Sequence, residues 1–139
     1  MEKLRSGWHP GGVQNLTEKT LAAIGRMTVA ATDLEHLLAW IGADRAGGDA
    51  AAVFARPGEA LVAARGSVQF AAAADREFLI AAVEAAATQL AISQSALRRL
   101  WLDERPADPA AFDAIASHLL RCREWLRNVI EERLSITVG

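Results

Sequence analysis

The sequence predicts an all-α protein. Hydrophobic residues make up 52% of the 139 residues, yet aromatic residues are only 6% and there is no tyrosine. Alanine carries most of the apolar content, and it favours helix because it loses no side-chain entropy there. Apolar residues also recur three and four positions apart along three long segments. We therefore expect an antiparallel bundle of three long helices plus one or two short, broken middle helices.

Residues 1–14 are expected to form an irregular arm before a single helical-bundle domain at 15–139. Gly7, Pro10, Gly11 and Gly12 all disfavour regular structure in the arm. Trp8 and His9 leave two interpretations open. Either the arm is a frayed terminus, or these two side chains dock it onto the domain or onto a neighbouring chain.

The first long helix is predicted from Asn15 to about Ile41. Asn15 and Glu18 have the spacing of a capping box, in which each side chain bonds a backbone N–H at the helix start. Gly42 and the pair Gly47-Gly48 are expected to end the helix. Its apolar stripe consists of Ile24, Met27, Ala31, Leu34, Leu38 and Ile41.

The middle of the chain predicts short helices. Asp49 can cap the segment "AAAVFA", and Pro57 suits the first position of a helix that reaches about Phe70. Gly58 and Gly66 each lower helix stability by about 1 kcal/mol relative to alanine. This region is therefore expected to depend on tertiary contacts.

Two more long helices follow. Asp75 is predicted to cap a helix that lasts to about Asp103, and Asp108-Pro109 is a strong start signal for the last helix. The tail 135–139 is expected to unwind. The stripe of the earlier helix is Leu79, Val83, Ala86, Leu90, Ser93, Leu97, Leu100 and Trp101, and that of the last helix is Phe112, Ile115, Leu119, Cys122, Leu126 and Val129.

Composition argues against several classes of function. The net charge is −2 and the pI about 5.9, so no broad positive field exists to attract nucleic acid or anionic lipid. A single cysteine cannot form an internal disulfide. The start lacks the apolar stretch of a secretory signal, and no window is expected to hold the ~20 apolar residues of a membrane span. The expected location is the cytoplasm.

Candidate catalytic and metal-binding groups are sparse. Cys122 falls on an apolar stripe, where cysteines are usually inert, and His118 is the only nearby base. Asp33 and His36 have a spacing that can present two metal ligands, which His9 or His118 could complete. A di-iron bundle would need a Glu-x-x-His pattern on two helices, however, and only one helix offers anything similar. We expect no enzyme activity, no metal and no cofactor.

The arginines of the last two helices could line up as a phosphate-binding groove, with Trp101 and Trp125 stacking on bases. Acidic residues are interleaved with them, which cancels the field and favours a solvated face held by ion pairs. The arginines are Arg98, Arg99, Arg121, Arg123, Arg127 and Arg133, and the acidic residues are Asp103, Glu104, Glu124, Glu131 and Glu132.

Protein binding is the remaining prediction. Large aromatic residues beside a narrow apolar stripe either complete the core or anchor an interface, where tryptophan and arginine are over-represented. We expect a homodimer that can also bind a protein partner. The candidate residues are Trp40, Trp101 and Trp125, with Arg121 and Arg127 as a charged rim.

The segment "LAAIGRMTVAATDLEHLLAWIGA", a glycine-bearing loop and "PGEALVAARGSVQF" together resemble the first half of bacterial HEPN-type helical bundles. Those bundles often dimerise. In that family the last helix carries an arginine, commonly Arg-Asn, followed a few residues later by a histidine, and this pair supports RNA cleavage. Arg127-Asn128 is present here, but residues 129–133 are Val-Ile-Glu-Glu-Arg. The resemblance therefore implies a catalytically silent bundle that binds a partner.

The sequence leaves three hypotheses. The favoured one is a non-enzymatic, self-associating protein that binds a protein partner in a regulatory, adaptor or assembly role. The first alternative is a degenerate HEPN-like protein that binds RNA through Arg121, Arg123 and Arg127, with an affinity that falls steeply with salt. The second is a small-molecule sensor with an apolar pocket between the helices.

Overall fold

The structure, a computed structural model, describes residues 11–103 and 105–133. Within these ranges it contains helices and no strand, so the all-α prediction is confirmed. The tail 135–139 and the proposed docking residues Trp8 and His9 lie outside the described residues. The α-helices are α1 (Glu18–Ala46), α2 (Ala50–Ala55), α3 (Glu59–Ser67), α4 (Ala73–Leu102) and α5 (Pro109–Arg133), and the 3-10 helices are η1 (Gly11–Asn15) and η2 (Val68–Phe70).

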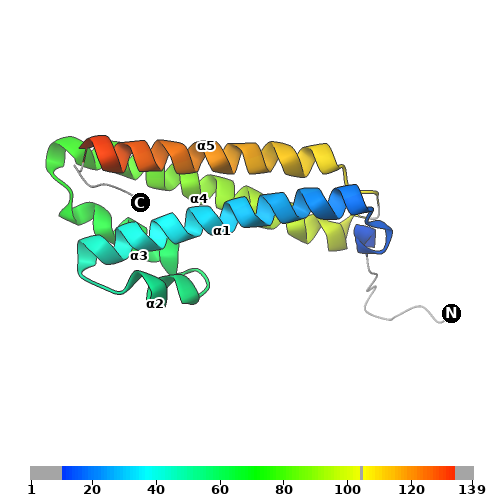
Figure 1. Cartoon of the computed structure of the whole chain (residues 1–139), viewed down its shortest axis with the longest axis horizontal. Helices are drawn as coiled ribbons and strands as arrows, with labels where there is room; N and C mark the ends of the chain where they lie inside the picture. The colour runs from blue at the N-terminus through cyan, green and yellow to red at the C-terminus, as the bar shows by residue number, and fades with distance from the viewer. Residues whose placement is uncertain (1–10, 104, 134–139) are drawn as a thin grey trace.

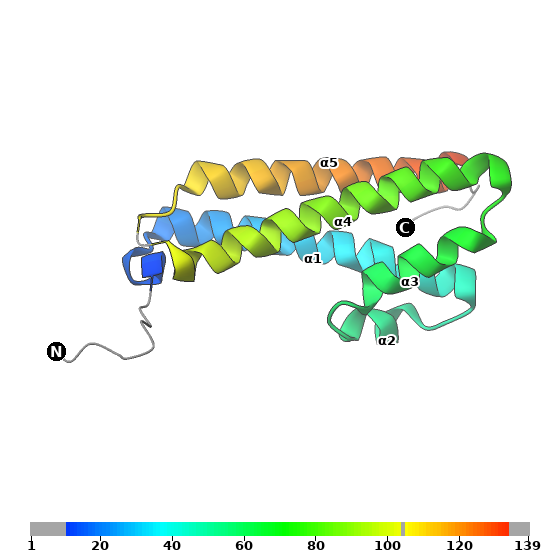
Figure 2. The same cartoon turned by 180° about the vertical axis from the view of Figure 1, so that it is seen from behind.

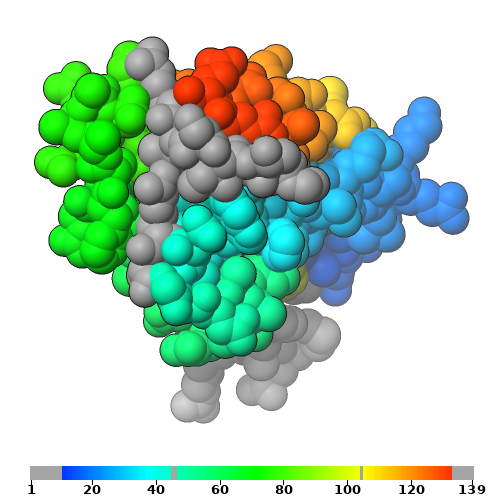
Figure 3. Space-filling model, turned by 60° about the vertical axis from the view of Figure 1, so that its left-hand side comes forward, coloured from blue at the N-terminus to red at the C-terminus, as the bar shows by residue number. Residues whose placement is uncertain are grey.

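The three longest helices lie side by side (Figures 1 and 2). α1 and α5 run in the same direction, and α4 runs opposite to both. The short helices α2 and α3 pack against the C-terminal half of α1, at the end of the molecule where α5 also finishes (Figures 1 and 3). α1 therefore contacts α5 along its length and α3 only near its end.

A continuous apolar core joins these helices. The predicted stripes supply most of it, because side chains three and four positions apart share one helix face. Ile24, Leu97, Ile115 and Cys122 are only partly buried, and Trp101 is exposed. The largest fully buried apolar side chains are Met27, Leu34, Leu38, Ile41, Leu79, Val83, Leu119, Leu126 and Ile130.

The first helix begins later than predicted. Thr17, not Asn15, is the N-cap, and its Oγ1 accepts a hydrogen bond of 3.2 Å from the Thr20 backbone N–H. Asn15 instead ends a 3-10 turn that docks on the C-terminal end of α4, where Gly12 N donates to the Asp103 carbonyl at 2.7 Å. Residues 11–14 of the expected arm form most of this 3-10 turn.

The helix also continues beyond its predicted end. Gly42 lies inside α1, and the helix ends at Gly47, which has the left-handed φ of 74° common at helix ends. A Cβ on Gly42 would lie 2.5 Å from the Cβ of Ala63 on α3. Gly42 is thus a packing glycine that lets two helices cross closely, and the prediction that it ends the helix is wrong.

Some of the predicted boundaries of the later helices are confirmed and others are wrong. Asp49 and Asp108 accept hydrogen bonds from the backbone N–H groups of Ala51 and Ala110, at 3.0 and 2.9 Å, which confirms both predicted helix starts. The predicted end of the long helix near Asp103 is also correct. Pro57 and Asp75 do not start helices as predicted, because α3 begins at Glu59 and α4 begins at Ala73.

α4 corrects one expectation about membranes. Among the described helices, α4 alone has an 18-residue window apolar enough for a membrane span, with a mean hydropathy of 1.2 and 33% of that window buried within the structure. The expectation that no segment reaches this level is therefore too strict. Core helices of soluble proteins pass the same test, so the observation is weak evidence for a membrane.

Candidate partner-binding groove

The three tryptophans proposed as interface residues lie on different parts of the molecule. Trp40 is partly buried and packs against the core. Trp101 is 52% exposed near the end of α4, and Trp125 is 44% exposed on α5. Because α4 and α5 are antiparallel, Trp101 stands near the start of α5, whereas Trp125 follows Pro109 by 16 residues, or roughly 24 Å along the helix. No single aromatic surface contains them.

The arginines of α5 have local partners. Arg127 forms ion pairs with Glu131 at 3.3 Å and with Glu124 at 3.7 Å on its own helix. The Arg121 guanidinium lies 2.6 Å from Nδ1 of His118. The two glutamates neutralise part of the positive charge that an RNA-binding face would need, whereas the contact with His118 adds no negative charge beside Arg121.

The two candidate reactive side chains, Cys122 and His36, contact different parts of the fold. The Cys122 thiol lies 3.8 Å from the Ala85 carbonyl of α4, and burial raises the pKa of this thiol despite the opposing effect of Arg121. The His36 ring meets Phe54 edge-on, with 5.0 Å between ring centroids. Within residues 11–103 and 105–133, no group of three or more His, Cys, Asp or Glu residues could hold a metal ion.

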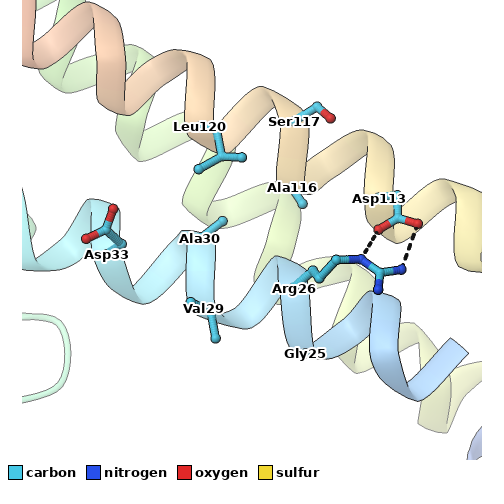
Figure 4. Close-up of a pocket in the computed structure, with 9 residues that line it drawn as sticks. All are labelled: Gly25, Arg26, Val29, Ala30, Asp33, Asp113, Ala116, Ser117 and Leu120. Atoms are coloured by element: carbon cyan, nitrogen blue, oxygen red, sulfur yellow. Dashed lines mark hydrogen bonds and ion pairs between the residues drawn. The ribbon is translucent and has the colours of Figure 1, made fainter. Parts of the chain in front are cut away.

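An open groove lies between the parallel helices α1 and α5 (Figure 4). Its volume is about 910 Å³. α1 and α5 are parallel because α4, which precedes α5 in the chain and runs opposite to both, carries the chain back to the end where α1 begins. The lining residues, which we call the α1/α5 groove, are Gly25, Arg26, Val29, Ala30 and Asp33 on α1 and Asp113, Ala116, Ser117 and Leu120 on α5.

The middle of the groove is apolar. Ala30 and Ala116 are buried at its base, where their small side chains let the two helices approach. Val29 is 70% exposed at the outer edge of α1, and Leu120 is 54% exposed on α5. Figure 4 shows Leu120 and Ala30 extending into the space between the helices. Leu120 therefore remains in water within a concave surface, and Val29 is exposed along its α1 edge.

An ion pair closes each end of this apolar stretch. Arg26 holds Asp113 with two hydrogen bonds, Nε to Oδ1 at 2.7 Å and Nη2 to Oδ2 at 3.0 Å. This contact lowers the pKa of the Asp113 carboxyl and raises that of the Arg26 guanidinium. At the other end Asp33 forms an ion pair with Nε of Arg123. The sign order is thus reversed between the two ends, since α1 carries the cation at one end and the anion at the other.

The sequence did not single out Arg26, Asp113, Val29 or Leu120 as functional residues. Arg26 and Asp33 are seven positions apart and therefore share one helix face, which is a signal available from spacing. Their partners on α5 could not be predicted, because Arg26 and Asp113 are separated by 87 positions.

Two smaller cavities adjoin each other where α4 meets α5, with volumes of about 270 and 160 Å³. Both include Ala96, Arg99 and Ile115. Each is smaller than the roughly 300–1,000 Å³ of most small-molecule sites. The α1/α5 groove, at about 910 Å³, lies within that range.

Comparisons with protein-family models, with curated proteins and with solved structures give no match, so the resemblance to HEPN-type bundles stays a prediction.

Proposed function

We propose that this chain is a non-enzymatic bacterial helical protein that self-associates and binds a protein partner in a regulatory, adaptor or assembly role. The observation that carries the proposal is the α1/α5 groove. It combines exposed apolar side chains at its centre with ordered charged pairs at its ends, which is the layout of a protein interface with an apolar centre and a polar rim. In this proposal the three long helices act as an antiparallel bundle that presents binding surfaces in the cytoplasm.

The chemistry of the reactive groups supports a role without catalysis. A nucleophilic thiol is activated by a lowered pKa, whereas burial raises the pKa of Cys122. His118, the only nearby base, contacts Arg121. Arg127, the arginine of the HEPN resemblance, pairs with glutamates of its own helix.

Trp125 is our candidate anchor for a different protein partner. Twelve residues separate it from Asp113, which places Trp125 roughly 120° around α5 from the groove. One face of α5 can then serve self-association while another binds the partner. Exposed tryptophans are favoured anchors because they bury a large apolar area and still donate a hydrogen bond.

Sedimentation velocity of the purified chain over a range of concentrations tests self-association. We expect a species of twice the 14.9 kDa chain mass at high concentration. A mass of 14.9 kDa at every concentration would refute self-association.

Affinity capture from native lysate at moderate salt tests partner binding. We expect one stoichiometric protein that is retained by the wild type and by Trp101→Ala but lost from Trp125→Ala. Far-UV circular dichroism should show unchanged helix content in both variants. Loss of the fold in Trp125→Ala would mean that this side chain belongs to the core, and equal capture by all three proteins would remove Trp125 as the anchor.

A further inference from the structure

We propose that the occupant of the α1/α5 groove is a second copy of this chain, related to the first by a two-fold axis, so that α1 and α5 of each protomer pack face to face as four helices. This inference rests on the self-association stated above and adds its surface and its symmetry.

The four charges of the two ion pairs beside the groove alternate in sign, both along each helix and across each end. Arg26 on α1 lies beside Asp113 on α5 at one end (Figure 4), and Asp33 on α1 forms an ion pair with Arg123 on α5 at the other. The groove therefore carries two ion-pair dipoles that point in opposite directions.

A two-fold rotation of this pattern places unlike charges opposite each other. If the axis lies across the helices, the two copies of α1 face each other in opposite directions, and Arg26 of one copy meets Asp33 of the other. If the axis lies along the helices, α1 faces α5 of the second copy, and Arg26 meets its Asp113. Arg123 is matched in the same way by Asp113 or by Asp33. Both arrangements are self-complementary, as a two-fold interface requires.

The apolar residues fit the same symmetry. Val29 and Leu120 lie between the two ion pairs along their helices. A two-fold axis across the helices brings each of them close to its counterpart, and an axis along the helices brings Val29 of one copy close to Leu120 of the other. Leu120 from both copies would then be buried at the centre, with the charges as a surrounding rim. A partner helix carrying charge of one sign would meet a like charge on each wall, which makes it a poorer occupant.

Gly25 provides an independent indication of a close neighbour. It lies inside α1 and lines the groove, yet a Cβ at this position would meet nothing within 4 Å among the residues that the structure describes. Glycine weakens a helix interior relative to alanine, so no contact within residues 11–103 and 105–133 explains its presence. A second protomer packed against α1 would explain this glycine, because the missing side chain lets another helix approach.

Charge reversal tests the proposal. The variant Asp33→Arg/Asp113→Arg makes all four charges of the two ion pairs positive, and the variant Arg26→Glu/Arg123→Glu makes all four negative. At a concentration where the wild type is dimeric, each variant alone should sediment at 14.9 kDa and their equimolar mixture at twice that mass. Far-UV circular dichroism of each variant checks the fold.

A second pair of variants avoids charge. Gly25→Leu should shift the dimer to monomer, whereas the matched control Gly66→Leu should not, because Gly66 lies in α3 outside the groove and also has nothing within 4 Å of its added Cβ. This pair keeps the proposal testable if a charge variant fails to fold.

The outcomes separate the two proposals. A wild type that is monomeric throughout overturns self-association and this inference with it. A dimeric wild type whose mass is unchanged in folded charge variants, or which Gly25→Leu leaves intact, overturns the groove as the interface and leaves self-association standing. Dimers that form only when the two charge variants are mixed support the two-fold arrangement.

Discussion

Replacing Gly42 with alanine tests how closely α1 and α3 cross. The added Cβ would lie 2.5 Å from the Cβ of Ala63 and 2.6 Å from its carbonyl carbon. Carbon atoms in favourable contact are about 3.5–4.0 Å apart, so the two helices must move apart by about 1 Å. Gly66→Ala on α3 is the matched control, because its added Cβ meets nothing within 4 Å.

The expected magnitudes follow from two opposing effects. Alanine in place of glycine favours a helix by about 0.5–1 kcal/mol at either position. Overpacking at Gly42 costs about 1–3 kcal/mol. Gly66→Ala should therefore raise the free energy of unfolding, and Gly42→Ala should lower it by up to about 2.5 kcal/mol. The difference between the two variants isolates the steric cost, since the change in helix propensity is common to both.

Urea unfolding followed by far-UV circular dichroism measures these free energies. Each variant should be compared with the wild type at one fixed protein concentration, because self-association adds to apparent stability. If Gly42→Ala is as stable as Gly66→Ala, the close approach of α1 to Ala63 is refuted, and α3 must pack elsewhere.

Two further predictions concern titration and reactivity. Because Arg26 lowers the pKa of Asp113, this pair stabilises the fold above the ordinary carboxyl pKa of about 3.9 and loses its effect as the pH falls through the lowered value. An NMR titration should show Asp113 titrating below that value in the wild type and close to it in Arg26→Gln; equal values in the two proteins would contradict the contact. Since burial raises the pKa of Cys122, iodoacetamide should alkylate it more slowly in the folded chain than in urea, and equal rates would place the thiol in open solvent.

Sequence signals predicted the helices well where the deciding interactions lie within one short segment. The stripe through Leu34 and Leu38 requires only that residues three and four apart share a face, and both side chains are fully buried. Asp49 and Asp108 cap helices because a short acidic side chain reaches the N–H groups two residues ahead.

The errors occurred where a distant segment decides the local structure. Asn15 has a good capping pattern, but the docking of the preceding turn on α4 moves the helix start to Thr17. Gly42 has the composition of a helix end, but its contact with Ala63 makes it an interior residue. A glycine looks the same in sequence whether it serves a turn or a close crossing of helices.

The α1/α5 groove also depends partly on local sequence and partly on contacts between distant segments. Sequence spacing by itself determined that this chain is all-α, which residues form the apolar stripes, and that Arg26 and Asp33 share a face of the first helix, because these depend on backbone hydrogen bonds and helical periodicity within one segment. Only the tertiary structure decided that α1 and α5 lie parallel, that Asp113 and Arg123 complete the alternating charges, and that Val29 and Leu120 stay exposed between them. The physical reason is that these contacts join segments about 90 residues apart, and their geometry depends on how the whole core closes.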